Sequence, residues 1–247
     1  PVNVIMDIAR IHFSNRDILL LFLPIAGELL LHYTVGIVDS IMVASVGEAA
    51  VSGVSLMDFV ISFFNSLLTA LAVGGTVVIG QYLGNADRPR AADAAVQMVL
   101  LMALAGTLLA LAAYALQPFI TGRLFGDLAP DVRRHADVYF GILAASLPFM
   151  GVYSAGAAVF RSIGNTVLPL RIMILANVLN VAGNAVLIYG FDMETEGIAL
   201  PTLAVRVLSA AAILLLLAVH ARRRGVVPRF RVSMGIARSF FVVGVPY

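Results

Sequence analysis

The sequence predicts an all-α polytopic membrane protein with six transmembrane helices. Of its 247 residues, 61% are hydrophobic and 12% are charged, whereas soluble domains average about 25% charged residues. The mean hydropathy is +0.99. The apolar residues gather in stretches of roughly 20 residues or more, the length that a helix needs to cross a bilayer. We expect spans at residues 18–46, 51–82, 91–116, 138–160, 168–189 and 198–220.

The composition also narrows the function classes. There is no cysteine, which excludes disulfides, thiol chemistry and cysteine-ligated metals. The net charge is only +2 and no lysine is present, so we expect membrane lipid rather than nucleic acid around this chain. No phosphate-binding loop, zinc-protease motif or nucleophile elbow occurs, and no nucleophile lies with a base. The sequence therefore indicates neither an enzyme nor a bound cofactor.

The arginines predict the orientation of the chain, because cytoplasmic loops are enriched in basic residues. With the N-terminus inside, twelve arginines fall in cytoplasmic segments and three in outer loops, while the loop 192–196 is acidic and falls outside. No cleavable signal peptide is visible. We expect both ends on the cytoplasmic side of the inner (plasma) membrane. Residues 1–17 form the N-terminal segment, 18–220 the six-helix lobe and 221–237 a basic linker.

The first span, with Pro24 near its start, contains the strongest functional signal. Asp39 lies in the middle of a long apolar run, and an intramembrane carboxylate is expensive unless it has a function. At 3.6 residues per turn, Glu28, His32 and Asp39 share one face. Two interpretations of Glu28 and His32 remain open: a route for protons or cations along this face, or a structural Glu–His pair beside a functional Asp39.

The next three spans are predicted from their length and apolar composition. The second carries a polar stripe of Asp58, Ser62, Asn65, Thr69 and Thr76 at helical spacing. This stripe is typical of a face that lines a cavity, with Asp58 and Asn65 as auxiliary polar groups. For the serine and threonines, close packing of small residues is the preferred interpretation.

The fifth span places Asn177, Asn180 and Asn184 on one face, at spacings of three and four residues. Their carbonyl oxygens suit a hard cation such as Na⁺. The alternative is hydrogen bonding between helices, a common use of asparagine in membranes. A carboxylate facing these amides favours a polar cation site.

In the sixth span, Pro201 frees a backbone carbonyl of the preceding turn, and Thr202 adds a hydroxyl beside it. Arg206 follows one turn later. Inside a bundle it needs an anionic or carbonyl partner, and we expect either a structural ion pair or a ligand role.

The last ten residues resemble the opening of the first span. Arg238 precedes Pro246 by eight positions, as Arg16 precedes Pro24, with mostly apolar residues between. Residues 238–247 therefore predict the start of a seventh helix in a second copy of the unit. Since transporters are often built from paired repeats, we expect a parent chain of about twice this length.

Five segments together resemble the amino-terminal lobe of the multidrug and toxic compound extrusion (MATE) transporters of the MOP superfamily. They follow one another in the family's order and cover nearly the whole chain: VDSIMV at 38–43, GGTVVIGQYLG at 74–84, RSIGNTVLP at 161–169, NVLNVAGNAVLIYG at 177–190 and GIALPTLAVR at 197–206. The resemblance implies one lobe of a twelve-helix, two-lobe carrier that exports organic cations and drugs in exchange for H⁺ or Na⁺. It also implies a cation-coupling site, with Na⁺ as one candidate ion, at Asp39, Asn180, Asn184 and Thr202.

Two positions depart from the family pattern. Asn184 is Asp in some members, and Pro201 stands where Ala is usual. On this resemblance we expect half of a secondary-active antiporter, whose partner is a carboxy-terminal lobe or a second copy. Two alternatives stay open: a lipid-linked oligosaccharide flippase of related architecture, disfavoured because only Arg206 lies mid-span, and a degenerate half-protein that does not transport.

Overall fold

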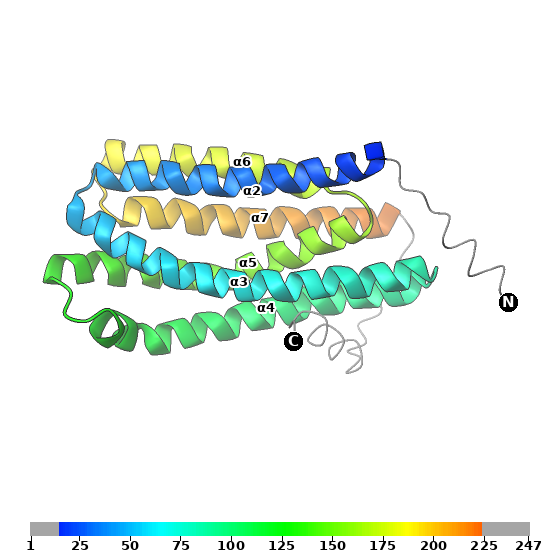
Figure 1. Ribbon diagram of the computed structural model, residues 1–247, viewed down its shortest axis with the longest axis horizontal. Coiled ribbons are helices and arrows are strands. Elements are labelled where there is room, and N and C mark those ends of the chain that lie inside the picture. The colour runs from blue at the N-terminus through cyan, green and yellow to red at the C-terminus, as the bar shows by residue number, and fades with distance from the viewer. Residues whose placement is uncertain (1–14, 224–247) are drawn as a thin grey trace.

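The computed structural model describes residues 15–223, which form one bundle of long helices (Figure 1). Six are long and apolar enough to cross a membrane, in agreement with the predicted spans. They are α2 (Asn15–Ala44), α3 (Glu48–Gly84), α4 (Arg88–Phe119), α5 (Pro130–Ser162), α6 (Val167–Ala185) and α7 (Glu196–Arg223). Short π-helical turns, η1 (Ile120–Leu124) and η2 (Val186–Gly190), extend α4 and α6.

Most helices run beyond the predicted spans. The largest difference is at α5, which begins at Pro130 rather than at residue 138. Proline suits the first helical turn, where its missing N–H is not needed, and the polar residues after it extend the helix past its apolar part. The predicted linker 221–237 lies almost wholly outside the described residues, as does most of segment 1–17. The predicted seventh helix at 238–247 lies entirely outside them.

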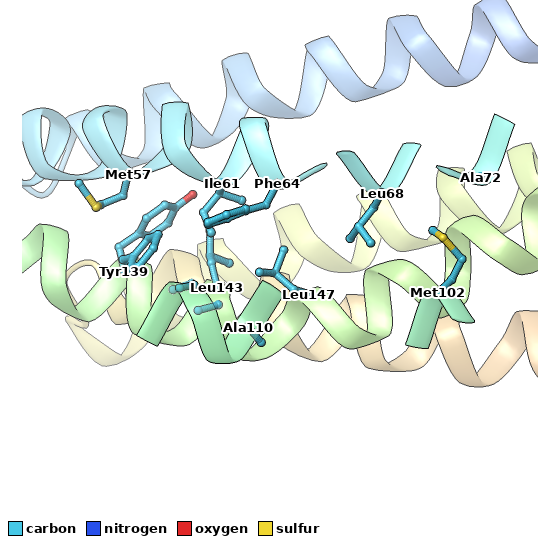
Figure 2. Close-up of a cluster of buried hydrophobic side chains, with 14 of the residues drawn as sticks. Met57, Ile61, Phe64, Leu68, Ala72, Met102, Ala110, Tyr139, Leu143 and Leu147 are labelled. Atoms are coloured by element: carbon cyan, nitrogen blue, oxygen red, sulfur yellow. The ribbon is translucent and has the colours of Figure 1, made fainter. Parts of the chain in front are cut away.

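Successive helices run in opposite directions, so α2 begins and α7 ends at the same end of the bundle (Figure 1). The helix α5 packs against α3, α4 and α7, while α2 packs mainly against α6. The core between α3, α4 and α5 is built from large apolar side chains (Figure 2). Met57 and Leu68 of α3 are both 0% exposed, as is Leu147 of α5. This core holds α3 and α5 in fixed register.

Two glycines allow these helices to approach closely. A Cβ on Gly53 of α3 would lie 2.7 Å from the carbonyl oxygen of Val132 on α5. A Cβ on Gly106 of α4 would lie 2.6 Å from the carbonyl oxygen of Leu147. Small residues at such crossings are typical of membrane bundles, where packing rather than the hydrophobic effect holds helices together.

The variant Gly106→Ala should lower the free energy of unfolding by about 1–3 kcal/mol, the usual cost of overpacking. The matched control is Gly80→Ala on α3, because no atom lies within 4 Å of the Cβ it would add. That control should be neutral or gain up to about 1 kcal/mol from helix propensity. Unfolding of both variants in detergent measures the difference, and equal stabilities would contradict this account of the crossing.

The turn between α5 and α6 sets where α6 begins. Gly164 adopts φ +80°, its N–H donates to the carbonyl of Arg161, and the N–H of Asn165 donates to the carbonyl of Phe160. This pattern is a Schellman motif, which ends a helix at a left-handed glycine. The side chain of Asn165 then accepts from the backbone N–H of Leu168 at 3.2 Å. The turn thus fixes the register of the asparagines on α6.

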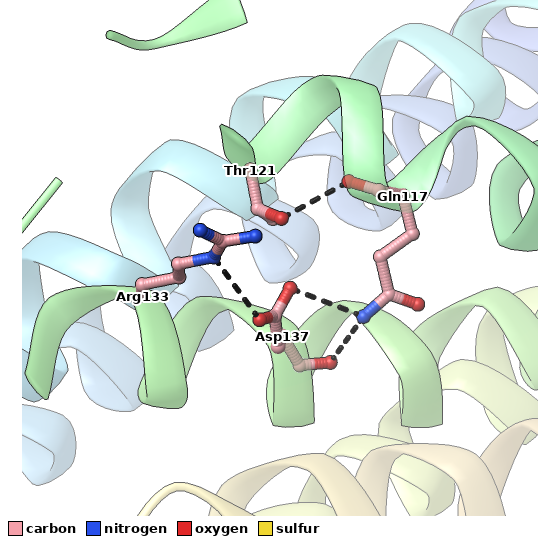
Figure 3. A network of polar contacts seen from close by, with 4 residues as sticks. All are labelled: Gln117, Thr121, Arg133 and Asp137. Atoms are coloured by element: carbon pink, nitrogen blue, oxygen red, sulfur yellow. Dashed lines mark hydrogen bonds and ion pairs between the residues drawn. The ribbon is translucent and has the colours of Figure 1, made fainter. Parts of the chain in front are cut away.

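Polar contacts fasten the opposite end of the bundle. The Gln117 amide donates to the backbone oxygen of Asp137 at 3.0 Å, and Arg133 pairs with the Asp137 carboxylate at 3.8 Å (Figure 3). The Thr121 hydroxyl of η1 donates to the backbone oxygen of Gln117 at 3.0 Å. Nearby, Arg134 pairs with Glu194. The buried His135 lies 2.6 Å from the Thr195 hydroxyl. These contacts tie the start of α5 to α4 and to the loop before α7.

Candidate functional site

The predicted coupling carboxylate meets the asparagine face of α6. Helices α2 and α6 run in the same direction, since Gly27 faces Leu170 and Asp39 faces Asn184. The Asn184 amide donates to Oδ1 of Asp39 at 2.7 Å. Asp39 lies five residues before the end of α2, so this contact is in the half of the bundle nearer the α2–α3 turn.

Thr202 reaches the same place from α7. Its hydroxyl lies 2.9 Å from the side-chain amide of Asn180. If the amide is turned by 180°, its nitrogen donates to Oδ1 of Asp39 at 3.3 Å and its oxygen accepts from the hydroxyl and N–H of Thr202. Neighbouring groups decide between such orientations. In both, Asn180 joins α6 to α7 beside Asp39.

One of the two positions that depart from the family pattern, Pro201, packs closely on α6. Helix α7 continues through Pro201, whose ring packs on Gly183: a Cβ there would lie 2.9 Å from the proline Cβ. Proline has no N–H, so one carbonyl in the first turn of α7 loses its usual donor. The Thr202 hydroxyl donates to a neighbouring carbonyl, that of Ile198, at 2.9 Å. Close packing at Gly183 therefore brings Thr202 to the asparagines.

The donor set suits a small cation. Asn180 and Asn184 are 4% and 0% exposed. Oδ1 of Asn184 is buried without a hydrogen-bond partner, and a buried unpaired acceptor is costly. The carboxylate of Asp39, the amide oxygens and the Thr202 hydroxyl are all hard oxygen donors, the kind that Na⁺ and protons take. The predicted residues Asp39, Asn180, Asn184 and Thr202 thus come together and fit such an ion.

A second polar group adjoins this one. The Tyr139 hydroxyl of α5 donates to Oδ1 of Asp58 at 2.6 Å, and Figure 2 shows it directed toward α3. Arg206 donates to the Ser146 hydroxyl at 2.6 Å and interacts electrostatically with both Asp39 and Asp58. Tyr139 and Ser146 are not among the residues predicted from the sequence. Tyrosines and serines are frequent near span ends and at helix crossings, so nothing in the sequence marks these two.

Among the described side chains, those of Glu28, Asn65 and Asn177 make no hydrogen bond to the site. Glu28 pairs with Arg161 of α5 at 2.9 Å, about 16 Å along α2 from Asp39. Arg161 was not predicted as the partner of Glu28 in either interpretation of Glu28 and His32. The side chain of His32 lies outside the described residues. Asn65 and Asn177 each have a buried side-chain atom without a hydrogen-bond partner.

The Glu28–Arg161 pair should be structural. Its side chains are 14% and 27% exposed, so Arg161→Gln, which leaves the carboxylate unpaired, should cost about 2–3 kcal/mol of stability. The double variant Glu28→Gln/Arg161→Gln should recover part of that loss. As a control, Arg90→Gln breaks a pair whose arginine is 71% exposed and should cost less than about 1 kcal/mol. Chemical unfolding of the unmodified protein and these three variants tests this, and a double variant no more stable than Arg161→Gln would contradict it.

Comparison with known proteins identifies the family. The MatE family model matches residues 24–186, which is 163 of the 247 residues. The chain belongs to the MatE family. This is a family of membrane transporters rather than enzymes, and the region matched contains Asp39, Asn180 and Asn184.

Two curated proteins are similar to this chain at low identity. The chain is 25% identical over 202 residues to a probable multidrug resistance protein, NorM, of Thermotoga maritima, covering 79% of this chain and 43% of NorM. It is also 25% identical over 199 residues to an uncharacterized transporter, YisQ, of Bacillus subtilis, covering 78% of this chain and 43% of YisQ. The chain therefore spans less than half the length of these relatives.

Solved structures agree on the fold. A MOP superfamily transporter from Pyrococcus furiosus matches 92% of this chain and 50% of its own, with a TM-score of 0.83 and 22% identity. A MATE structure in complex with MaL6 matches 92% of this chain and 51% of its own, with a TM-score of 0.85 and 23% identity. The six helices thus correspond to about half of a twelve-helix MATE transporter.

Proposed function

We propose that this chain is the amino-terminal-type lobe of a secondary-active antiporter that exports organic cations and drugs in exchange for H⁺ or Na⁺. The observation that carries the proposal is the cluster of hydrogen bonds that joins Asp39, Asn180, Asn184 and Thr202. One carboxylate, held by an amide donor beside an unpaired amide oxygen, provides a place for a single small cation. The multidrug resistance relative supports the transport class.

Ion occupancy would act through the helices that meet at this site. A cation bound to Asp39 neutralises the carboxylate and so changes the electrostatic interactions of Asp39 with neighbouring groups. Helices α2, α6 and α7 each contribute one side of the site, so their relative positions depend on that charge. A ligand shifts a conformational balance only through different affinities for the two states. We expect the ion to favour one packing of α2 on α6, with Pro24 as the position where α2 bends.

We also propose that both ends of the lobe face the cytoplasm. The start of α2 and the end of α7 lie at one end of the bundle, together with the α3–α4 and α5–α6 turns. Among the residues described, this end carries Arg88, Arg90 and Arg161, and Arg222 and Arg223 lie in the last turn of α7. Basic residues favour the cytoplasmic side. The coupling site would then lie in the outer half of the membrane.

The flippase alternative receives less support from the site. A carrier of anionic headgroups needs unneutralised positive charge at its centre. Within the described part of the chain, Arg206 is the arginine whose charge acts on this site, and the negative charges of Asp39 and Asp58 offset it. The degenerate half-protein alternative predicts no ion or drug binding, and the experiments below distinguish it.

The test is efflux of ethidium from cells that lack their own drug pumps. The gene would be expressed alone and joined to the carboxy-terminal lobe of a full-length MatE relative, each with and without Asp39→Asn. We expect ion-driven efflux in at least the joined form and loss of efflux in the variant. Efflux that Asp39→Asn leaves unchanged would overturn the proposed coupling site.

A further inference from the structure

The proposed ion site has a second carboxylate beside it, and the two face different surroundings. Asp39 bonds to Asn184, which is fully buried. Asp58 is exposed at the surface of the lobe, although it lies ten residues inside α3 (Glu48–Gly84). A carboxylate at membrane depth does not face lipid chains, so the surface around Asp58 faces water or a polar ligand.

The side chains around Asp58 suit an organic cation. Phe59 and Phe63, one turn apart on α3, are 75% and 60% exposed. Ser62 is exposed one turn after Asp58. Aromatic faces attract cations, and a carboxylate beside them supplies the opposite charge. The Tyr139 hydroxyl is the one hydrogen-bond donor to Asp58 recorded within residues 15–223, which leaves its other oxygen for a ligand.

The surroundings of Asp39 suit a different ligand. Oδ1 of Asn184 is buried and unpaired, and Asn180 and Thr202 add further oxygen atoms. A small ion that loses its hydration shell needs several oxygens converging on it, and Asp39 has them. A bulky organic cation needs open surface, and Asp58 has it. The two carboxylates therefore differ in the size of the cation they can take.

The positive charge of Arg206 acts on both Asp39 and Asp58. Arg206 interacts electrostatically with both carboxylates, and these also interact with each other. Arginine stays protonated in proteins. With both carboxylates ionised, the three groups carry a net charge of −1. One monovalent cation brings the group to zero, and a second would leave an uncompensated positive charge at membrane depth, which is unfavourable.

We propose that Asp58, with Phe59 and Phe63, binds the transported organic cation, and that Arg206 limits the Asp39–Asp58 pair to one added positive charge. The organic cation and the coupling ion then displace each other through charge without sharing a binding position. This rests on the proposed function, because it takes Asp39 as the ion site. Linkage requires the effect to be reciprocal: each cation weakens the other by the same factor.

The test measures binding of tetraphenylphosphonium to the purified 247-residue chain in nanodiscs, at increasing Na⁺ and at decreasing pH. Binding to the unmodified protein should weaken as the coupling ion is added. Asp58→Asn keeps an acceptor for Tyr139 but loses the charge, and its affinity should fall about tenfold or more. Asp39→Asn gives the group the charge of the ion-bound state, so the variant should bind tetraphenylphosphonium as weakly as the ion-saturated unmodified protein, and adding the ion should not weaken this binding further. The control Asp131→Asn, exposed at the start of α5, should behave like the unmodified protein.

A second variant tests the charge limit itself. Arg206→Gln keeps a donor for Ser146 and removes the positive charge, so the pair should accept both cations together. We expect tighter tetraphenylphosphonium binding and little displacement by the ion. Unmodified protein that does not bind tetraphenylphosphonium, an Asp58→Asn variant that binds it normally, or displacement that persists in Arg206→Gln would each overturn this proposal.

Failure of this inference and failure of the proposed function give different results. If Asp58→Asn has no effect while Asp39→Asn still abolishes stabilisation by the coupling ion, the ion site stands and the organic cation binds elsewhere. If Asp39→Asn leaves that stabilisation unchanged, the ion site itself is wrong. Thermal unfolding of every variant in the absence of ligand separates lost binding from lost folding.

Discussion

Asp39→Asn should abolish the stabilisation of this protein by its coupling ion. An ion that binds only the folded protein stabilises it by an amount set by its concentration, about 2.7 kcal/mol at one hundred times its dissociation constant. Asparagine keeps the size of the side chain and an acceptor for the Asn184 amide but carries no charge. The measurement is the melting temperature of the purified chain as Na⁺ is added and, separately, as the pH is lowered.

The expected effect on Asp39→Asn can be separated from a general loss of stability. The variant should melt close to the unmodified protein when the ion is absent, because its hydrogen bond to Asn184 can persist. Glu28→Gln serves as the matched control, since Glu28 is a second carboxylate on α2 that pairs with Arg161 instead. That control should lose stability but keep its full response to the ion. An unchanged response in Asp39→Asn would remove the basis of the proposed coupling site.

Asn184→Asp should make the folded protein depend strongly on acid or on Na⁺. The change replaces the amide that donates to Asp39 at 2.7 Å by a second carboxylate in a position with 0% exposure. Two adjacent carboxylates cannot both ionise without strong repulsion. The variant should therefore be destabilised by about 2–4 kcal/mol at neutral pH without Na⁺, and should regain most of this as the pH falls or Na⁺ rises.

The double variant Asn184→Asp/Asp39→Asn restores a single carboxylate opposite an amide, with the two groups exchanged between α2 and α6. It should recover the stability that Asn184→Asp loses and show again a weak dependence on pH. Chemical unfolding between pH 5 and pH 8, with and without Na⁺, distinguishes the three proteins. A double variant as unstable as Asn184→Asp would show that the loss comes from packing around residue 184 and not from repulsion between charges.

The residues of the candidate site could be singled out from the sequence because each interrupts a strong local pattern. Asp39 is a carboxylate within a long apolar run, and Asn180 and Asn184 share a helical face, so the cost of burying polar groups and helical periodicity both point to these residues. The resemblance to MATE transporters added Thr202. The same helical periodicity grouped Glu28 with Asp39 on one face of α2. A shared face does not show which neighbouring helix each side chain contacts, and Glu28 pairs with Arg161 of α5.

The long apolar stretches by themselves determined that this protein spans the membrane with six helices, since a bilayer leaves a polar backbone few other solutions. They also determined that Asp39 needs polar partners. The tertiary structure alone decided which partners it has. Packing of Pro201 on Gly183 brings Thr202 to Asn180, the Tyr139 hydroxyl donates to Asp58, and Arg206 donates to Ser146 while its charge acts on both carboxylates. Such contacts join residues far apart in sequence, and they depend on how helices cross and approach, which no local pattern records.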